Sequence, residues 1–351
     1  MRILVYGAGN MGSLYAVLLK ESGQEVSILA RGKRLADIRD HGIRLDNTAN
    51  GKRTEVRVTA VERLEIDDGY DLVLVILPKH HVSEVLPILA ANRATPSVMF
   101  FGNNAAGPRE LVEAVGRDRL LLGFPGAAAV ARDGSIHYLI TSAREQPTTI
   151  GELDGARSPR ITAIASVLKA AGFSAAICSN MDAWLKTHVA KISPTANSLY
   201  MAGGDLGRLA RTRDALLLML RAIREGFSVL RALDIPLTPA NHRIFLWLPE
   251  PLLLVIMRRM VKSEGMSIKI GHALGARSEM QTIADEFRSL AASTSVSTPA
   301  MDRLYGYLDP SAQPLTDGSA DISLNWRGVW VPGLGLVAVA ALVALWSRGA
   351  L

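Results

Sequence analysis

The sequence predicts an α/β fold in two parts: an N-terminal doubly wound parallel sheet and an all-α C-terminal domain. Short apolar runs alternate with amphipathic helical patterns over the first 180 residues, as in a series of β-α-β units. From residue 181 to residue 308 the pattern is helical almost throughout. The length of 351 residues also exceeds what one hydrophobic core usually serves. We therefore expect domains over 1–180 and 181–308, followed by a linker and an apolar tail over 309–351.

The first element is a strand followed by a glycine turn and a helix. Residues 2–6 form an apolar run, and the G-x-G-x-x-G pattern of residues 7–12 follows it directly. In this context the pattern is typical of a Rossmann-type site for a dinucleotide pyrophosphate. Gly7 permits the turn, Gly9 lets the backbone approach the phosphates, and Gly12 lets the helix pack on the strand. The predicted cofactor-binding residues here are Gly7, Ala8, Gly9, Asn10, Met11 and Gly12. A glycine turn without a ligand is the alternative.

The end of the second strand indicates which dinucleotide binds. Residues 25–29 read as the second strand, and Arg31, Lys33 and Arg34 follow it with no carboxylate among them. An acidic residue here would bind the ribose hydroxyls of NAD, whereas cations suit the 2′-phosphate of NADP. The sequence therefore predicts NADPH as the cofactor, with Arg31 among its ligands. A solvated basic turn is the alternative.

Three later apolar runs read as further strands of the same sheet, over residues 71–77, 97–101 and 119–124. In doubly wound sheets the ligand lies beyond the carboxyl ends of the parallel strands. Lys79 follows the first of these runs and Asn103 follows the second, so both are predicted to bind the cofactor. Residues 135–141 read as another strand and residues 159–171 as a helix.

The helical half contains two long amphipathic patterns, over residues 214–233 and 279–292. An apolar run at residues 245–257 is interrupted by Pro249 and Pro251. Because proline breaks a helix interior, this run reads as a core helix and not as a membrane span.

Composition and charge narrow the class of ligand. Hydrophobic residues make up 49% and charged residues 21% of the chain, as in a globular protein. The net charge of +6 favours anionic ligands such as a phosphorylated cofactor or a carboxylate substrate, or an acidic membrane surface. The single cysteine, Cys178, and the scattered histidines predict neither a disulfide nor a metal site. Without a nucleic-acid-binding motif, the expected partner is a small-molecule substrate.

The stretch from Val329 to Trp346 is uncharged and apolar. Crossing a bilayer needs about 20 such residues, and Pro332 with Gly333 shortens any regular helix. Two interpretations stay open: a membrane anchor, or a helix docked on this chain or on a partner. The strand that begins at residue 2 leaves no room for a signal peptide, so the N-terminal part is expected in the cytoplasm. A homodimer also stays open.

Two segments of the helical half resemble motifs of the ketopantoate reductase family. Residues 184–194 read Trp-Leu-Lys-Thr-His-Val-Ala-Lys-Ile-Ser-Pro, similar to that family's W-x-K motif followed by a proline. Residues 277–280, Arg-Ser-Glu-Met, precede a helix and then Ser297-Thr298-Pro299, similar to the family's late glutamate motif. Together with the glycine loop, residues 29–31 and Asn103 in the same order, the resemblance covers residues 1–308.

The resemblance implies roles for individual residues. Lys186 is implied to protonate the carbonyl oxygen, which suits a lysine because burial lowers its pKa toward neutral. Glu279 is implied to contact the cofactor and the substrate hydroxyls and to balance the lysine's charge. Ser267 matches the family's substrate-binding serine, and Asn103 matches its cleft asparagine. A solvated lysine and a glutamate that only opens a helix are the alternatives.

The sequence departs from the family's pattern at several ligand-binding positions. The family's strand-end lysine aligns with Pro78, and Lys79 stands one place later. Its substrate-binding asparagines align with Ala190, Ser193 and the pair Gly203-Gly204. Asn197 lies on roughly the same helical face as Lys186, so it is expected to bind the substrate together with Ser193. A site that has lost polar partners should bind the same hydroxylated ligand poorly.

These observations predict an NADPH-dependent reductase of a 2-keto acid, with its site in the cleft between the two domains. Hydride passes from the cofactor to the carbonyl carbon and Lys186 protonates the oxygen, while Glu279 and Ser267 orient the substrate. Two alternatives stay open. One is a related dehydrogenase acting on an imine or a β-hydroxy acid, and the other is a non-catalytic NADP(H)-binding protein tethered to a membrane.

Overall fold

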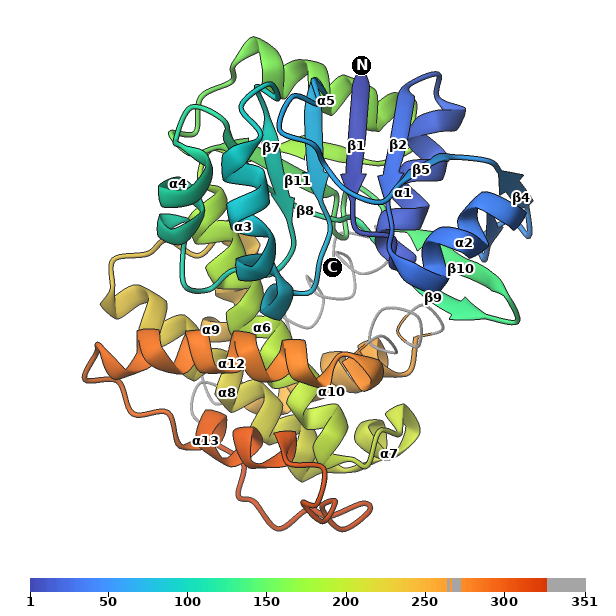
Figure 1. Ribbon diagram of the computed structural model, residues 1–351. Helices are drawn as coiled ribbons and strands as arrows, with labels where there is room; N and C mark the ends of the chain where they lie inside the picture. The colour runs from blue at the N-terminus through green and yellow to red at the C-terminus, as the bar shows by residue number, and fades with distance from the viewer. Residues whose placement is uncertain (264–265, 267–272, 327–351) are drawn as a thin grey trace. The chain divides into compact units, whose positions relative to one another are not determined.

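The computed structural model describes residues 1–263, 266 and 273–326 (Figure 1). The chain divides into two compact units, Met1–Asp182 and Ala183–Leu351. The first unit is built on a mostly parallel sheet with helices on its faces, and the second unit is helical throughout its described elements. The predicted fold class is therefore confirmed.

The N-terminal unit contains an eight-stranded sheet in the order β12-β11-β8-β7-β6-β1-β2-β5. The strands from β8 to β5 in this order run parallel to one another, and β11 pairs antiparallel with β8. From β1 the chain adds β2 and β5 on one side of the sheet and then β6, β7 and β8 on the other side. The switch point of this doubly wound sheet therefore lies between β1 and β6. The strands are β1 (Arg2–Tyr6), β2 (Glu25–Leu29), β5 (Thr59–Val61), β6 (Leu72–Val75), β7 (Val98–Phe101), β8 (Leu120–Phe124), β11 (Thr148–Glu152) and β12 (Ala175–Ile177).

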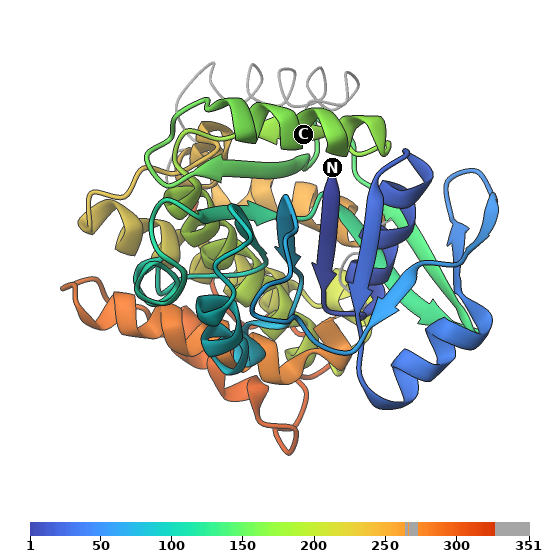
Figure 2. The ribbon, with the colours of Figure 1, turned by 45° about the horizontal axis from the view of Figure 1, so that its top comes forward.

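Helices cover both faces of this sheet (Figure 2). Helices α1 and α5 pack together on one face, and α3 and α4 pack together on the other. A smaller four-stranded sheet, in the order β4-β3-β10-β9, contacts α1, so α1 lies between the two sheets. The remaining elements of the unit are α1 (Asn10–Glu21), α2 (Gly32–His41), β3 (Ile43–Asn47), β4 (Arg53–Val56), η1 (Lys79–His81), α3 (Val82–Ala91), α4 (Arg109–Val115), β9 (Ala127–Arg132), β10 (Ser135–Ile140) and α5 (Pro159–Ala170).

An aromatic cluster fixes α1 in the core of this unit. The fully buried ring of Tyr15 stacks on Phe173, with centroids 4.1 Å apart, and meets Phe101 edge-on at 5.3 Å. Its hydroxyl forms a hydrogen bond of 2.8 Å with Oγ1 of Thr148, so the polar end is satisfied as well. The N-terminus of α1, where the glycine loop ends, is held in place by this packing.

The helical unit is arranged around α8, which contacts α7, α9, α10, α12 and α13. Helix α6 also approaches α8 closely, because a Cβ added to Gly226 would lie only 3.1 Å from Cβ of Ala190. Pro249 separates α9 from α10, as its position in the apolar run predicted. The elements are α6 (Met181–Met201), α7 (Leu206–Arg211), α8 (Arg213–Ala232), η2 (Ala240–Arg243), α9 (Ile244–Trp247), α10 (Glu250–Val261), α12 (Arg277–Ala292), α13 (Pro299–Tyr305) and η3 (Gly306–Leu308).

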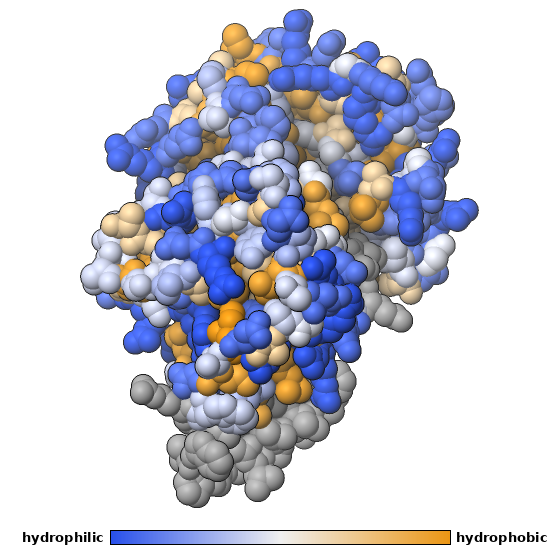
Figure 3. Space-filling model, turned by 90° about the horizontal axis from the view of Figure 1, so that it is seen from below, coloured by the Kyte–Doolittle hydropathy of each residue, from blue (hydrophilic) through white to orange (hydrophobic). Residues whose placement is uncertain are grey.

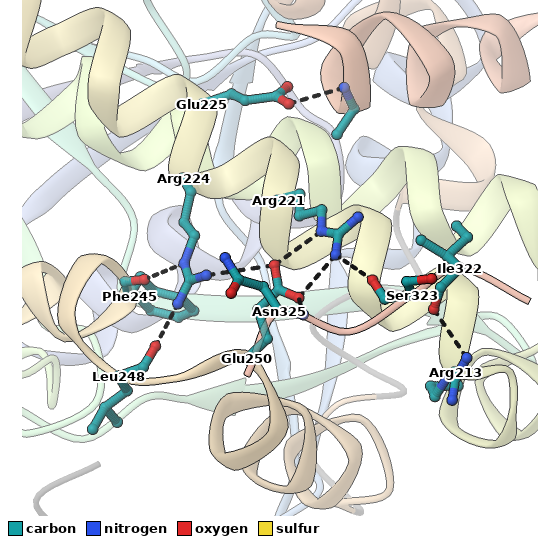
Figure 4. Close-up of polar contacts among 11 residues, drawn as sticks. Arg213, Arg221, Arg224, Glu225, Phe245, Leu248, Glu250, Ile322, Ser323 and Asn325 are labelled. Carbon is teal, nitrogen blue, oxygen red and sulfur yellow. Dashed lines mark hydrogen bonds and ion pairs between the residues drawn. The ribbon is translucent and has the colours of Figure 1, made fainter. Parts of the chain in front are cut away.

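The segment expected to be a polar linker is firmly attached where it passes along α7, α8 and α10. We call residues 314–325 the C-terminal strap. The buried carboxylate of Asp214 accepts hydrogen bonds from two backbone N–H groups of the strap, at 2.8 and 3.0 Å. The buried carboxylate of Glu250 accepts the N–H of Asn325 at 2.9 Å, and Arg221 donates to both Glu250 and the strap (Figure 4). These acceptors lie 75 to 108 residues earlier in the chain, so a local sequence pattern could not reveal them.

Apolar side chains on the face seen in Figure 3 are interspersed among hydrophilic ones. The large apolar side chains exposed in the helical unit's described part are Trp247, Val255, Met260, Leu274 and Trp326. Within residues 1–263, 266 and 273–326, no helix has the length and apolar character needed to span a membrane. The apolar run at 329–346, for which an anchor was considered, lies outside the described residues.

Candidate active site

The glycine loop joins β1 to α1, and its outer two glycines are closely packed against the backbone. A Cβ at Gly7, where φ is +120°, would lie 2.3 Å from the carbonyl oxygen of Ile76. A Cβ at Gly12 would lie 1.9 Å from the carbonyl oxygen of Gly7, whereas a Cβ at Gly9 would meet nothing within 4 Å. The fold therefore requires the outer two glycines, and the middle one leaves open space beside the start of α1. A phosphate fits such a space, because the N–H groups of a helix's first turn attract anions.

Arg31 immediately precedes α2 as its N-cap residue. Its Nη2 lies 3.4 Å from the hydroxyl of Tyr6, the last residue of β1. Burial raises the pKa of Tyr6, an effect that the charge of Arg31 and this contact partly offset. A permanent positive charge is thus placed next to the glycine loop, at the ends of two adjacent strands.

Lys79 and the segment after β7 are joined by a side-chain contact. Lys79 begins η1, and its Nζ donates to Oδ1 of Asn104 at 3.2 Å. The buried Asn104 in turn donates to the carbonyl oxygen of Gly107 at 2.9 Å. Asn103 occupies the half-buried position just before it. A role was predicted for Asn103 and none for Asn104, although the sequence shows both asparagines at the end of this strand.

The predicted cofactor residues of the N-terminal unit lie at one edge of the main sheet. β2, β1, β6 and β7 are adjacent and parallel, so their carboxyl ends meet at the same edge. Gly7–Gly12 follows β1, Arg31 follows β2, Lys79 follows β6 and Asn103 follows β7. The structure therefore brings these positions together, while their roles as ligands stay predictions.

One face of α6 carries three of the residues predicted to act on the substrate. Lys186, Ser193 and Asn197 are separated by seven and four residues, a spacing that puts them on one side of a helix. All three are buried, with relative exposures of 9%, 4% and 3%. Oδ1 of Asn197 is buried and accepts no hydrogen bond from the described part of the chain. A buried acceptor without a donor is costly, and a bound ligand is one way of satisfying it.

Tyr200 connects this face of α6 to the start of α12. Its hydroxyl donates to the carbonyl oxygen of Ala273, and the guanidinium of Arg277 lies 4.0 Å from the centre of its ring. Burial raises the pKa of Tyr200 to about 12; Arg277 opposes this rise and the negative charge of Glu279 adds to it. Glu279, in the first turn of α12, therefore interacts electrostatically with Tyr200, near the C-terminal end of α6. Sequence reasoning missed Tyr200, although it stands three residues after Asn197 on the same helical face.

Small residues occupy positions of α6 and its C-terminal end where the resemblance implies asparagines. Ala190 lies against Gly226 of α8, where a Cβ added to the glycine would lie 3.1 Å from Cβ of Ala190. Gly203 and Gly204 have φ values of +71° and +81° and end the helix. Ser267, the predicted partner of the substrate carboxylate, lies outside the described residues.

Comparisons with known proteins show which family this chain resembles. The family model described as Ketopantoate reductase PanE/ApbA matches residues 3–155. The 2-dehydropantoate 2-reductase of Mesorhizobium japonicum is 25% identical over 263 residues, which span 65% of this chain and 77% of that protein. The predicted resemblance to this family is confirmed.

Solved structures show the same fold over most of the chain. The 2-dehydropantoate 2-reductase from Geobacter metallireducens has a TM-score of 0.69 at 18% identity, with 89% of this chain and all of that one covered. D-mandelate dehydrogenase, solved with NADH and anilino(oxo)acetate, has a TM-score of 0.70 at 18% identity, covering 88% of this chain and 97% of that one.

Proposed function

Because the chain is related to the ketopantoate reductases, we propose that it reduces a 2-keto acid to the 2-hydroxy acid with NADPH. The observation that carries this proposal is one buried face of α6, along which the polar side chains of Lys186, Ser193 and Asn197 follow one another. Polar groups are buried at such a density mainly where a ligand or a reaction uses them.

Residues of the N-terminal unit would hold the cofactor. The backbone of Gly9 and the first turn of α1 suit the pyrophosphate, and Arg31 suits the 2′-phosphate. Lys79 and Asn103 follow neighbouring strands at the same edge. A bound NADPH supplies the hydride that the carbonyl carbon receives.

Residues of the helical unit would manage charge on the substrate. As hydride reaches the carbon, negative charge grows on the carbonyl oxygen, and the ammonium of Lys186 stabilises it and delivers the proton. Glu279 balances the lysine's charge and, with Ser267, orients the substrate. Oδ1 of Asn197 offers an acceptor to a donor group of the substrate, and Ser193 adds a hydroxyl beside it.

The test is NADPH oxidation, followed by absorbance, with a panel of 2-keto acids. Lys186→Ala should lower kcat by about 10²–10⁴-fold, the usual contribution of a general acid, while NADPH affinity stays unchanged. Lys262→Ala, at an exposed lysine of the same unit, is the matched control and should keep full activity. An active Lys186→Ala variant would show that another group protonates the oxygen, and a wild-type protein that turns over no keto acid would refute the proposal.

A second candidate is an oxidoreductase that interconverts an aromatic 2-keto acid and its 2-hydroxy acid. The fold similarity to D-mandelate dehydrogenase favours it. Aromatic 2-keto acids and NADH therefore belong in the same assay. Turnover restricted to aromatic substrates would select this candidate over the first.

A further inference from the structure

We propose that Arg34 is a positioning residue of the glycine loop: it fixes the peptide between Ala8 and Gly9 so that the loop offers N–H groups to the cofactor's pyrophosphate. This inference rests on the proposed binding of NADPH. The sequence grouped Arg34 with Arg31 as part of one basic turn suited to a 2′-phosphate. In the structure the two arginines have different neighbours.

The guanidinium of Arg34 reaches back from the first turn of α2 to the loop. Its Nε donates to the carbonyl oxygen of Ala8 at 3.3 Å, and its Nη2 donates to Oγ of Ser13 at 3.0 Å. The fully buried Ser13 donates in turn to the same Ala8 oxygen at 3.2 Å. Nη1 is paired with the carboxylate of Asp37, which holds the guanidinium in this orientation. The planar fork of arginine suits such a set of simultaneous contacts.

These contacts determine which way the loop's peptide groups face. In a trans peptide the carbonyl oxygen and the N–H point in opposite directions. Because the oxygen of Ala8 is held by Arg34 and Ser13, the N–H of Gly9 points away from them. If this peptide turned over, its carbonyl dipole would repel a phosphate instead of attracting it. Arg34 therefore favours the loop conformation that binds a phosphate.

Arg31 has no such contact and instead lies beside the hydroxyl of Tyr6. The two arginines should consequently affect different parts of the cofactor. Arg31 should matter for the 2′-phosphate, which only NADPH carries. Arg34 should matter for the pyrophosphate, which NADPH and NADH share. This difference makes the proposal testable with two ligands.

The experiment is a fluorescence titration of the full chain with NADPH and with NADH. Arg34→Ala should raise both Kd values by a similar factor, about tenfold or more, as expected for a lost charged hydrogen bond. Arg31→Ala should raise the Kd of NADPH alone. Arg34→Lys keeps the charge but cannot make the fork, so it should bind both cofactors as weakly as Arg34→Ala. The control is Arg39→Ala, at an exposed arginine of the same helix whose guanidinium donates to the carbonyl oxygen of Ala60, and it should bind both cofactors normally.

Three outcomes would overturn the role of Arg34. They are unchanged binding in Arg34→Ala, a loss confined to NADPH, and full recovery in Arg34→Lys. If Arg34→Ala does not fold, Arg34→Lys and Ser13→Ala give the same comparison, and both should weaken the two cofactors in parallel. A wild-type chain that binds neither cofactor would refute the proposed function as well, so the two failures are distinguishable.

Discussion

Replacing Glu250 by glutamine tests whether the C-terminal strap is an integral part of the helical unit. The carboxylate is 4% exposed and accepts hydrogen bonds from Nε and Nη2 of Arg221 and from the N–H of Asn325, all at 2.9 Å (Figure 4). Burial acts to raise the pKa of Glu250, but the bonds from Arg221 and Asn325 outweigh it and hold the pKa below its ordinary value. The ionised form is therefore the one that stabilises the fold.

The structure also limits the loss of folding stability that Glu250→Gln should cause. Removing one partner of a fully buried ion pair costs about 3–5 kcal/mol. Arg221 is 31% exposed and glutamine keeps one acceptor oxygen, so we expect about 2–3 kcal/mol for Glu250→Gln. For a domain of this size that loss lowers Tm by roughly 4–12 °C. A lowered pKa gives stability that is present above the unfolded pKa of glutamate and disappears as the pH falls through the folded pKa, so the difference should vanish in acid.

Differential scanning calorimetry measures the change, and hydrogen exchange locates it. The amides of the strap that bond to Asp214 and Glu250 should exchange faster in the variant. The control is Glu113→Gln, which breaks the exposed 2.9 Å pair with Arg109 and should cost less than about 1 kcal/mol. Equal Tm values for the two variants, or unchanged exchange in the strap, would show that the strap adds nothing to stability.

Further substitutions test the loop and the helical core. Gly12→Ala should unfold or strongly destabilise the N-terminal unit, because its Cβ would lie 1.9 Å from a backbone oxygen. Gly9→Ala should keep the wild-type Tm but lose NADPH affinity, because its Cβ would meet nothing within 4 Å. Melting curves and NADPH titrations separate the two variants. Gly226→Ala should cost about 1–3 kcal/mol in urea unfolding, because Ala190 lies 3.1 Å from the new Cβ. Burial raises the pKa of Glu225 despite its bonds to two backbone N–H groups, so wild type should lose stability relative to Glu225→Gln as the pH rises from 4 to 7. A pH-independent difference would contradict this.

Local patterns in the sequence were enough to predict the first β-α-β unit. The strands at 2–6 and 25–29 have the predicted bounds, because a buried parallel strand is an apolar run and the glycine pattern marks its end. Helix α1 begins at Asn10, inside the glycine pattern, with Gly9 as its N-cap and no side-chain bond at the cap. The positions of Lys79 and Asn103 followed from the same rule about strand ends.

Features that depend on distant partners could not be predicted in this way. The smaller sheet is formed by two strand pairs, β3 with β4 and β9 with β10, that lie far apart in the chain. They are joined by the parallel pairing of β3 with β10, which no local pattern reveals. Asn104 and Tyr200 gain their importance from contacts with Lys79 and Arg277. The strap reads as a linker because its own side chains are polar, and its bonds come mainly from arginines and carboxylates of earlier helices. The contacts that give these residues their importance appear only in the tertiary structure.

Ala190 on α6 and Gly226 on α8 pack against each other, and the small size of Ala190 has a consequence for the substrate. The small side chain of Ala190 lies close to Gly226, so the loss of that polar group and the close helix approach go together. Tyr200 cannot replace it, because its hydroxyl is already bonded to Ala273. Among the buried polar side chains of α6, those predicted to act on the substrate are Lys186, Ser193 and Asn197. We therefore expect keto acids with apolar side chains to have higher kcat/KM than hydroxylated ones, and the opposite order in the substrate panel would contradict this reasoning.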